Sequence, residues 1–297
     1  DDERYPLVRR TEAYWQRGHA RSNLKDKDGA ADDYKKAITL STNIIVDSST
    51  KPELKVLALS IRAGAKSNLG DNVGAIADYS SIIEMPGARS VVVAWKLINR
   101  GVEREKLGDN VGAVADCTEA LRLSITPRCR AVALCNRAMA RERLHQDGAD
   151  LIADYTEIVN LGVSVVDPDS LSLAYINRGF YRGKMGDCAG EIADCTAALS
   201  HVGVSVGNRG RALINRALAR CKLNDTRGAM ADYTDLIALG SAASAETMAI
   251  AYSERGRLKL AIQDYIGAIA DCDASIRLGA AGGANTLSAA YCNRGVA

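Results

Sequence analysis

The side chains that could act as nucleophiles or metal ligands are scattered along this sequence rather than gathered in one site. The three histidines are far apart, at His19, His145 and His201, and none has a Cys or Ser partner at a motif spacing. The sequence contains no HExxH and no GxxxxGK[ST] stretch, and its eight cysteines form no CxxC pair. We therefore expect no catalytic residues, no bound metal and no cofactor, and we predict that the protein is not an enzyme.

Charged residues, by contrast, recur at a regular spacing. One column consists of arginines: Arg17, Arg62, Arg100, Arg137, Arg178, Arg216, Arg255 and Arg294. A second consists of aspartates, 16 residues after the arginine in six units and 17 in the fourth: Asp33, Asp78, Asp116, Asp154, Asp194, Asp232 and Asp271. On facing helices such residues can form bidentate ion pairs. Buried charges are normally paired, so we interpret these columns as structural Arg–Asp pairs that fix the register of each hairpin.

Two further columns are candidates for binding. The first is an asparagine directly before the arginine, at Asn99, Asn136, Asn177, Asn215 and Asn293. The second is basic and lies four residues after the arginine, including Arg104, Arg141, Arg182 and Arg220, with Lys184 and Lys222 close by. An amide can both donate to and accept from an extended backbone. The basic column either forms a positive stripe for an acidic ligand or pairs with acids such as the aspartate column.

The elements that carry these columns are two helices per unit. In the third unit, apolar residues at helical spacing predict a first helix from Ser90 to Lys106. Gly108 and Asp109 end it, and Asp109 is placed to cap a second helix that carries Ala113 and Cys117 on one face. Loops join the units, and we expect four prolines to lie in them: Pro52, Pro86, Pro127 and Pro168.

These units resemble the tetratricopeptide repeat family. Residues 212–239 align with the family pattern without a gap: Ala217 and Ala229 occupy its small positions and Tyr233 its aromatic position. The resemblance covers about residues 5–297 and implies an all-α fold, a right-handed α-solenoid of about seven helix–turn–helix repeats plus a partial eighth. The units are 37 to 45 residues long, whereas the family period is about 34, so family geometry is expected to transfer only within each hairpin.

We predict that residues 1–297 form a single array. Its repeats run approximately over 5–48, 49–87, 88–125, 126–166, 167–204, 205–242 and 243–280, with a partial repeat at 281–297. A chain that ends within a first helix suggests either a fragment of a longer protein or a final capping helix.

Composition narrows the classes of partner. The net charge of +2 and the few aromatic residues argue against nucleic acid, and no apolar run is long enough to span a membrane. Cys117, Cys195 and Cys272 occupy a position that is Tyr in other repeats, which favours buried thiols in a reducing, cytoplasmic compartment, although the N-terminus lacks an initiator Met.

The resemblance implies a function in protein interaction. In the adaptor proteins that these repeats resemble, the asparagine faces a concave groove and binds a peptide. We therefore predict a scaffold that binds an extended, acidic peptide or protein segment. Two alternatives are a sensor or regulatory domain of a larger protein with a catalytic domain elsewhere, and a structural array that self-associates through its C-terminal partial repeat.

Overall fold

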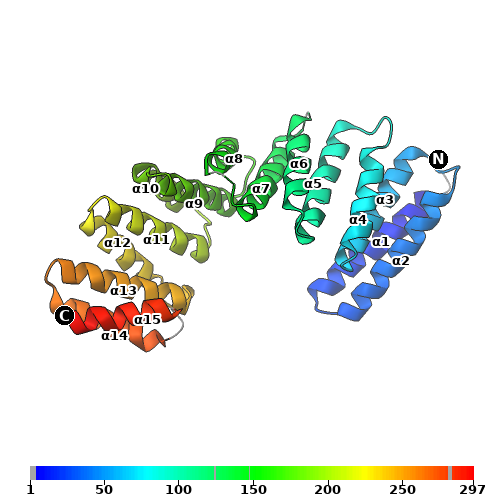
Figure 1. Ribbon diagram of the computed structural model, residues 1–297. Coiled ribbons are helices and arrows are strands. Elements are labelled where there is room, and N and C mark those ends of the chain that lie inside the picture. Colours follow the sequence, from blue (N-terminus) through cyan, green and yellow to red (C-terminus); the bar gives the residue numbers. More distant parts are fainter. Residues whose placement is uncertain (1–4, 124, 147, 280–282) are drawn as a thin grey trace. The chain divides into compact units, whose positions relative to one another are not determined.

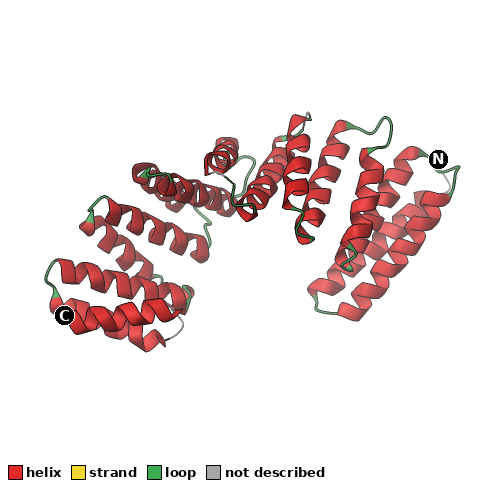
Figure 2. Ribbon diagram, in the orientation of Figure 1, coloured by secondary structure: helices red, strands yellow, loops and turns green. Residues whose placement is uncertain are grey.

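The computed structural model describes residues 5–123, 125–146, 148–279 and 283–297, and within these ranges the regular structure is entirely helical (Figures 1 and 2). The fold is therefore all-α and of the α-solenoid class, as predicted. Contacts divide the chain into two compact units, Asp1–Gln146 and Asp147–Ala297. Each unit is described by itself, so the expectation of one continuous array over 1–297, with its repeat boundaries, stays a prediction.

Unit 1 contains seven of the described helices. They are α1 (Tyr5–Asn23), α2 (Lys27–Val46), α3 (Pro52–Asn68), α4 (Asn72–Ile83), α5 (Ser90–Lys106), α6 (Asn110–Arg122) and α7 (Pro127–Arg143). Consecutive helices from α1 to α7 pack against one another, and α1 also contacts α3, as α5 contacts α7. First helices therefore contact first helices of the next repeat.

Unit 2 contains the remaining described helices. They are α8 (Gly148–Leu161), α9 (Pro168–Lys184), α10 (Cys188–Ser200), α11 (Val206–Lys222), α12 (Thr226–Ala238), α13 (Ala245–Ala261), α14 (Tyr265–Leu278) and α15 (Gly283–Val296), with a short 3₁₀ turn, η1, at Gly240–Ala242. The helix α9 contacts α11, and α15 packs against both α13 and α14.

The turn is built the same way in six hairpins, those whose second helices are α2, α4, α6, α10, α12 and α14. An aspartate such as Asp109 caps the second helix, because its side chain accepts a hydrogen bond from the backbone N–H of Gly112. A Cβ on Gly112 would overlap the Asp109 carboxylate, which explains the glycine three residues after the cap. The residue before the cap has positive φ, and Gly108 adopts it at 82° without strain. The predicted end of the first helix and the predicted cap are both confirmed here.

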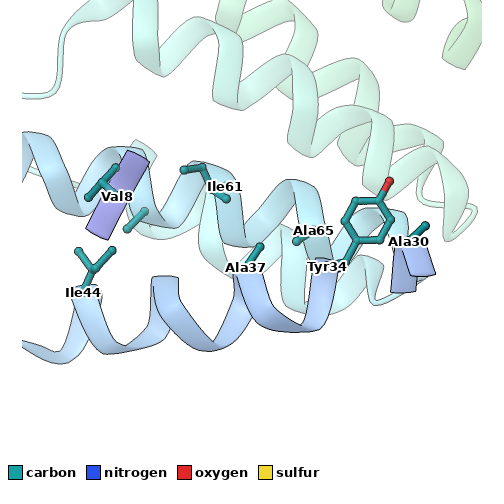
Figure 3. Close-up of a cluster of buried hydrophobic side chains, with 8 residues drawn as sticks. Val8, Ala30, Tyr34, Ala37, Ile44, Ile61 and Ala65 are labelled. Atoms are coloured by element: carbon teal, nitrogen blue, oxygen red, sulfur yellow. The ribbon is translucent and has the colours of Figure 1, made fainter. Parts of the chain in front are cut away.

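Small residues let the helices pack closely. Where α1, α2 and α3 pack together, Ala30, Ala37 and Ala65 share one buried cluster with Val8 and Tyr34 (Figure 3). Alanine is among the best helix-forming residues, and its short side chain allows two helix backbones to approach. The sequence indicated this arrangement by its abundance of alanine and its scarcity of aromatic residues.

The prolines do not all lie in loops, contrary to the expectation. Pro52, Pro127 and Pro168 are each the first residue of a first helix, whereas Pro86 precedes α5 in a loop. A proline fits the first helical turn because its missing N–H would have no partner inside the helix. These residues therefore begin helices.

Candidate binding surface

The arginine and aspartate columns meet inside the hairpins. Within the described residues, the structure brings six of the seven predicted pairs together, all bidentate: Arg17–Asp33, Arg62–Asp78, Arg100–Asp116, Arg178–Asp194, Arg216–Asp232 and Arg255–Asp271. In one of them, Arg178 Nε lies 3.0 Å from Asp194 Oδ2 and Nη2 lies 2.6 Å from Oδ1. The fourth pair, Arg137 with Asp154, stays a prediction because its members belong to different units.

The same arginines also link consecutive repeats. The remaining guanidinium nitrogen, Nη1, donates to a hydroxyl on the second helix of the preceding repeat, for example from Arg216 to Thr196 Oγ1 at 3.1 Å. The other hydroxyls that accept in this way are those of Thr42, Ser80, Thr118, Thr156 and Thr234. Sequence reasoning missed this column, although five of its six members stand two residues after an aspartate.

The basic column is paired rather than free. Arg104, Arg182 and Arg220 each bind the aspartate of their own hairpin, at 3.0, 3.0 and 2.7 Å. The pairing alternative that the sequence left open is therefore the one observed for these three residues. The physical reason is their position one helical turn after the marker arginine, on the side that faces the second helix. Arg141 also has interactions of its own, and its role in binding stays a prediction.

Pairing does not remove the positive charge of the hairpins. Asp194 is shared by Arg178 and Arg182, so this cluster keeps a net charge of +1. In other hairpins the second cation is also paired, as Arg104 is with Asp109 at 3.7 Å and Arg220 is with Asp225 at 3.6 Å. The carboxylate of Asp194 is 4% exposed, whereas the side chain of Arg182 is 29% exposed. The Asp194 hairpin therefore has one more cation than it has carboxylates among these residues.

The asparagine column lies between neighbouring first helices. Asn177 donates from Nδ2 to the Tyr155 hydroxyl at 3.1 Å and accepts from Arg211 Nη2 of the next first helix at 3.3 Å. Asn99 forms a similar hydrogen bond with the hydroxyl of Tyr79, whose pKa is raised to about 12, chiefly by burial. All five asparagines, Asn99, Asn136, Asn177, Asn215 and Asn293, are half-buried.

Asn215 differs because its neighbour lacks a hydroxyl. The equivalent of Tyr155 in the preceding repeat is Cys195, and among the described residues the Asn215 side chain has no hydrogen-bond partner. Asn177 still has one free amide N–H after its bond to Tyr155. Both amides can therefore bind a ligand backbone.

An exposed apolar residue follows Asn136, Asn177 and Asn215 by three positions. Phe180 is 39% exposed and Leu218 is 42% exposed, while Met139 is 43% exposed in unit 1. A cation stands four residues after each of these apolar residues, as Lys184 does after Phe180. Asn177, Phe180 and Lys184 therefore share one face of α9. Asn215, Leu218 and Lys222 repeat this triplet on α11, where sequence reasoning had identified only the polar members.

The two triplets form one surface on unit 2, because α9 and α11 are in contact. We call it the α9–α11 face and define it by Asn177, Phe180, Lys184, Arg211, Asn215, Leu218 and Lys222. The Lys184 ammonium lies 4.7 Å from the centre of the Phe180 ring, a cation–π contact that needs no carboxylate. The Lys222 ammonium lies 4.0 Å from the buried carboxylate of Glu191, and its side chain is 55% exposed. The face thus combines amides, exposed apolar groups and accessible cations.

Trp15, Trp95 and Phe180, which all lie on first helices, differ in their surroundings. Trp15 and Trp95 pack against the buried clusters of unit 1, as core packing predicts. Phe180 does not, because it projects from α9 beside Lys184. It is therefore a surface residue rather than a core residue.

One serine stands in a sequence of the form G-x-S-x-G, from Gly203 to Gly207. In hydrolases that motif lies between a strand and a helix, and the serine is exposed as a nucleophile. Here it lies between α10 and α11, and the Ser205 hydroxyl caps α11 by accepting from the N–H of Asn208 at 3.3 Å. The geometry assigns Ser205 a structural role.

Comparison with known proteins identifies the repeat. A sequence profile described as a tetratricopeptide repeat matches residues 11–44, which contain most of the first hairpin. Residues 11–44 therefore carry a tetratricopeptide repeat. Tetratricopeptide repeats generally serve as protein-interaction scaffolds, and a search of curated proteins found no match to this chain.

Solved structures share the tetratricopeptide fold. The C-terminal part of a tetratricopeptide repeat protein from Cytophaga hutchinsonii is 12% identical, with a TM-score of 0.67, and the match covers 95% of this chain and 98% of that one. A tetratricopeptide repeat protein from Parabacteroides merdae is 16% identical, with a TM-score of 0.50 and coverage of 95% and 98%. A signal transduction ATPase from Pyrococcus horikoshii with a tetratricopeptide repeat sensor is 10% identical, with a TM-score of 0.51, and 47% of its chain is covered against 96% of this one.

Two further findings concern this tetratricopeptide chain. Within the described residues, every helix is too short or too polar to cross a lipid bilayer. In the same part of the chain, His, Cys, Asp and Glu side chains form no group of three able to hold a metal ion.

Proposed function

We propose that this protein is an interaction scaffold whose α9–α11 face binds an extended, acidic segment of another protein. The observation that carries the proposal is the repeated triplet of asparagine, exposed apolar residue and lysine on α9 and α11. Repetition of the same three groups suits an extended chain, which presents backbone groups at regular intervals.

Each group of the triplet has a distinct role in this proposal. Asn177 and Asn215 bind the backbone of the segment, while Phe180 and Leu218 pack against its apolar side chains. Lys184, Lys222 and Arg211 attract its carboxylates, and the cations that share Asp194 and Asp232 add to the positive field. The basic residues Arg182 and Arg220 act from within the hairpins, not as direct contacts.

The test is selection from a library of random peptides displayed on phage, with the full chain as bait. We expect the enriched peptides to combine Asp or Glu with apolar residues. The variant Lys184→Glu/Lys222→Glu should lose them, while a matched control with two exposed lysines of α2, Lys27→Glu/Lys35→Glu, should retain them. Enrichment of peptides that bind both variants equally would contradict the proposal.

A second candidate function is that of a sensor domain in a larger protein. It is favoured by the fold likeness to the Pyrococcus horikoshii signal transduction ATPase, in which the tetratricopeptide repeats are the sensor. The two candidates separate on one observation, because a catalytic domain encoded in the same gene favours the sensor. The absence of any such domain from the gene would leave the scaffold.

We also propose a reducing compartment for the protein. All eight cysteines are free, and Cys117, Cys129, Cys195 and Cys272 are buried. Burial raises the pKa of the Cys195 thiol to about 12, so this thiol remains protonated and unreactive. Unchanged stability of the purified protein in dithiothreitol would agree with this proposal, and loss of stability would contradict it.

A further inference from the structure

Unit 1 has a candidate ligand site of its own, on helices other than α9 and α11. A pocket of about 540 Å³ opens between α3, α5 and the loop from Met85 to Arg89. We call it the α3–α5 pocket and define it by Pro52, Glu53, Val56, Leu57, Ser60, Met85, Pro86, Gly87, Ala88, Arg89, Val92 and Lys96. Its volume falls in the range of small-molecule sites, roughly 300–1,000 Å³.

The walls of the pocket are mainly apolar. Val56 and Leu57 contribute from α3, Val92 contributes from α5, and Met85 and Pro86 contribute from the loop. The hydroxyl of Ser60 is already used, because it donates to the carbonyl of Val56 at 2.7 Å. A ligand therefore meets carbon atoms over most of this surface, and an apolar chain would bury itself here favourably.

Lys96 is the exception within these walls. It is half-buried, and burial lowers the pKa of its ammonium group. Its Nζ lies 5.9 Å from the centre of the Tyr79 ring, and no carboxylate pairs with it among the described residues. Lys106, the last residue of α5, shows the usual arrangement, with Glu103 Oε1 at 2.9 Å. A half-buried cation without an acidic partner is costly, and a bound anion would relieve that cost.

The rim adds to the positive charge. Arg89 and Glu53 are both exposed there, so together with Lys96 the site has a net charge of +1. The pocket therefore presents one half-buried positive charge, that of Lys96, at an otherwise apolar wall. That combination matches a molecule with one negative group and one apolar chain.

We propose that the α3–α5 pocket binds a small monocarboxylic acid of medium chain length, with its carboxylate on Lys96 and its chain against Val56, Leu57 and Val92. A peptide segment is a poorer occupant, because its backbone N–H and C=O groups would lie against apolar walls without partners. The site involves helices other than those of the α9–α11 face, so it goes beyond the scaffold function.

The experiment is calorimetric titration of the full chain with octanoate and, separately, with the neutral alcohol 1-octanol. Octanoate should bind in a 1:1 ratio and more tightly than 1-octanol. Lys96→Met should weaken octanoate by about ten-fold, the value of one charge-assisted hydrogen bond, and leave 1-octanol unchanged. Lys27→Met, which removes an exposed lysine outside the pocket, should change neither.

A further variant tests the apolar wall. Val92→Trp should fill the pocket and abolish binding of both ligands. Binding of 1-octanol by Lys96→Met reports that the pocket is still folded, so a lost octanoate signal cannot be ascribed to unfolding. The proposal is overturned if neither ligand binds, if 1-octanol binds as tightly as octanoate, or if Lys96→Met and Lys27→Met behave alike.

Discussion

Replacing Arg178 with methionine tests the role of the Arg–Asp columns in stability. The change removes three donors: two to Asp194, at 3.0 and 2.6 Å, and a longer one to Thr156 at 3.5 Å. Asp194 remains buried, with only Arg182 Nη1 at 3.0 Å as its cationic partner. Breaking a buried pair from one side costs about 3–5 kcal/mol. Because Arg182 still compensates part of the charge, we expect a loss of about 3 kcal/mol.

The assay is urea unfolding of the full chain, followed by circular dichroism at 222 nm. Arg227→Met, which removes an exposed arginine of α12, is the matched control and should change the free energy of unfolding by less than about 0.5 kcal/mol. Adding Asp194→Asn to Arg178→Met should recover part of the loss, because the uncompensated carboxylate is its main cause. The reasoning is refuted if Arg178→Met and the Arg227 control unfold at the same urea concentration.

Three further predictions concern Glu191 and the hairpin turns. Gly183→Ala should destabilise the wild type by about 1–3 kcal/mol, because its Cβ would overlap the Glu191 carboxylate. In a Glu191→Ala background the same change should stabilise the protein by about 0.5–1 kcal/mol. Urea titrations that show the same sign of the change in unfolding free energy in both backgrounds would contradict this. Burial raises the pKa of Glu191 in the folded protein above its ordinary value of 4.5. The protonated form therefore contributes its full stability below pH 4.5, and this contribution is lost as the pH rises through the raised pKa of the folded protein. Glu191→Gln should therefore raise the melting temperature at pH 7, and the gain should shrink towards pH 4; a gain independent of pH would disprove the assignment. Gln263 and Gly108 precede the caps of their hairpins with φ of 64° and 82°. Gln263→Gly should therefore raise the free energy of unfolding by up to about 1 kcal/mol, whereas Gly108→Ala should lower it. If both changes shift the free energy of unfolding in the same direction, positive φ does not determine the residue preferred at this position.

The hairpins could be predicted from sequence because their signals are local. The helix expected over Ser90–Lys106 coincides with α5, and the expected cap at Asp109 is present. Each depends on residues within one or two turns of each other. The Arg–Asp contacts were also accessible, because their fixed offset follows from the length of a hairpin.

The binding surface was less predictable because it depends on how repeats stack. Arg182 and Lys184 are two residues apart, yet Arg182 turns inward to Asp194 while Lys184 lies over Phe180. Their charge does not distinguish them. The one that is neutralised is the one whose position around α9 faces the second helix of the hairpin, α10. The Thr and Ser column was visible as a pattern, but its partners lie in the next repeat.

Glu191 illustrates a compensation that a column analysis misses. It stands where five other repeats have alanine and the fourth has Leu151. It is buried, and its Oε2 accepts no hydrogen bond among the described residues, with the Lys222 ammonium 4.0 Å away. Gly183, on the facing helix α9, provides the space for it. The two departures from the repeat pattern are therefore one feature, and only the packing of α9 on α10 reveals it.

The affinity of an acidic peptide for the asparagine variants tests the central claim most directly. A selected peptide should be titrated against the wild type, Asn177→Ala/Asn215→Ala and the control Asn43→Ala/Asn160→Ala, whose asparagines are exposed on α2 and α8. Two lost hydrogen bonds of about 1 kcal/mol each predict that the first variant binds at least roughly ten-fold more weakly, while the control matches the wild type. Equal affinity for all three proteins would contradict the assignment of the α9–α11 face.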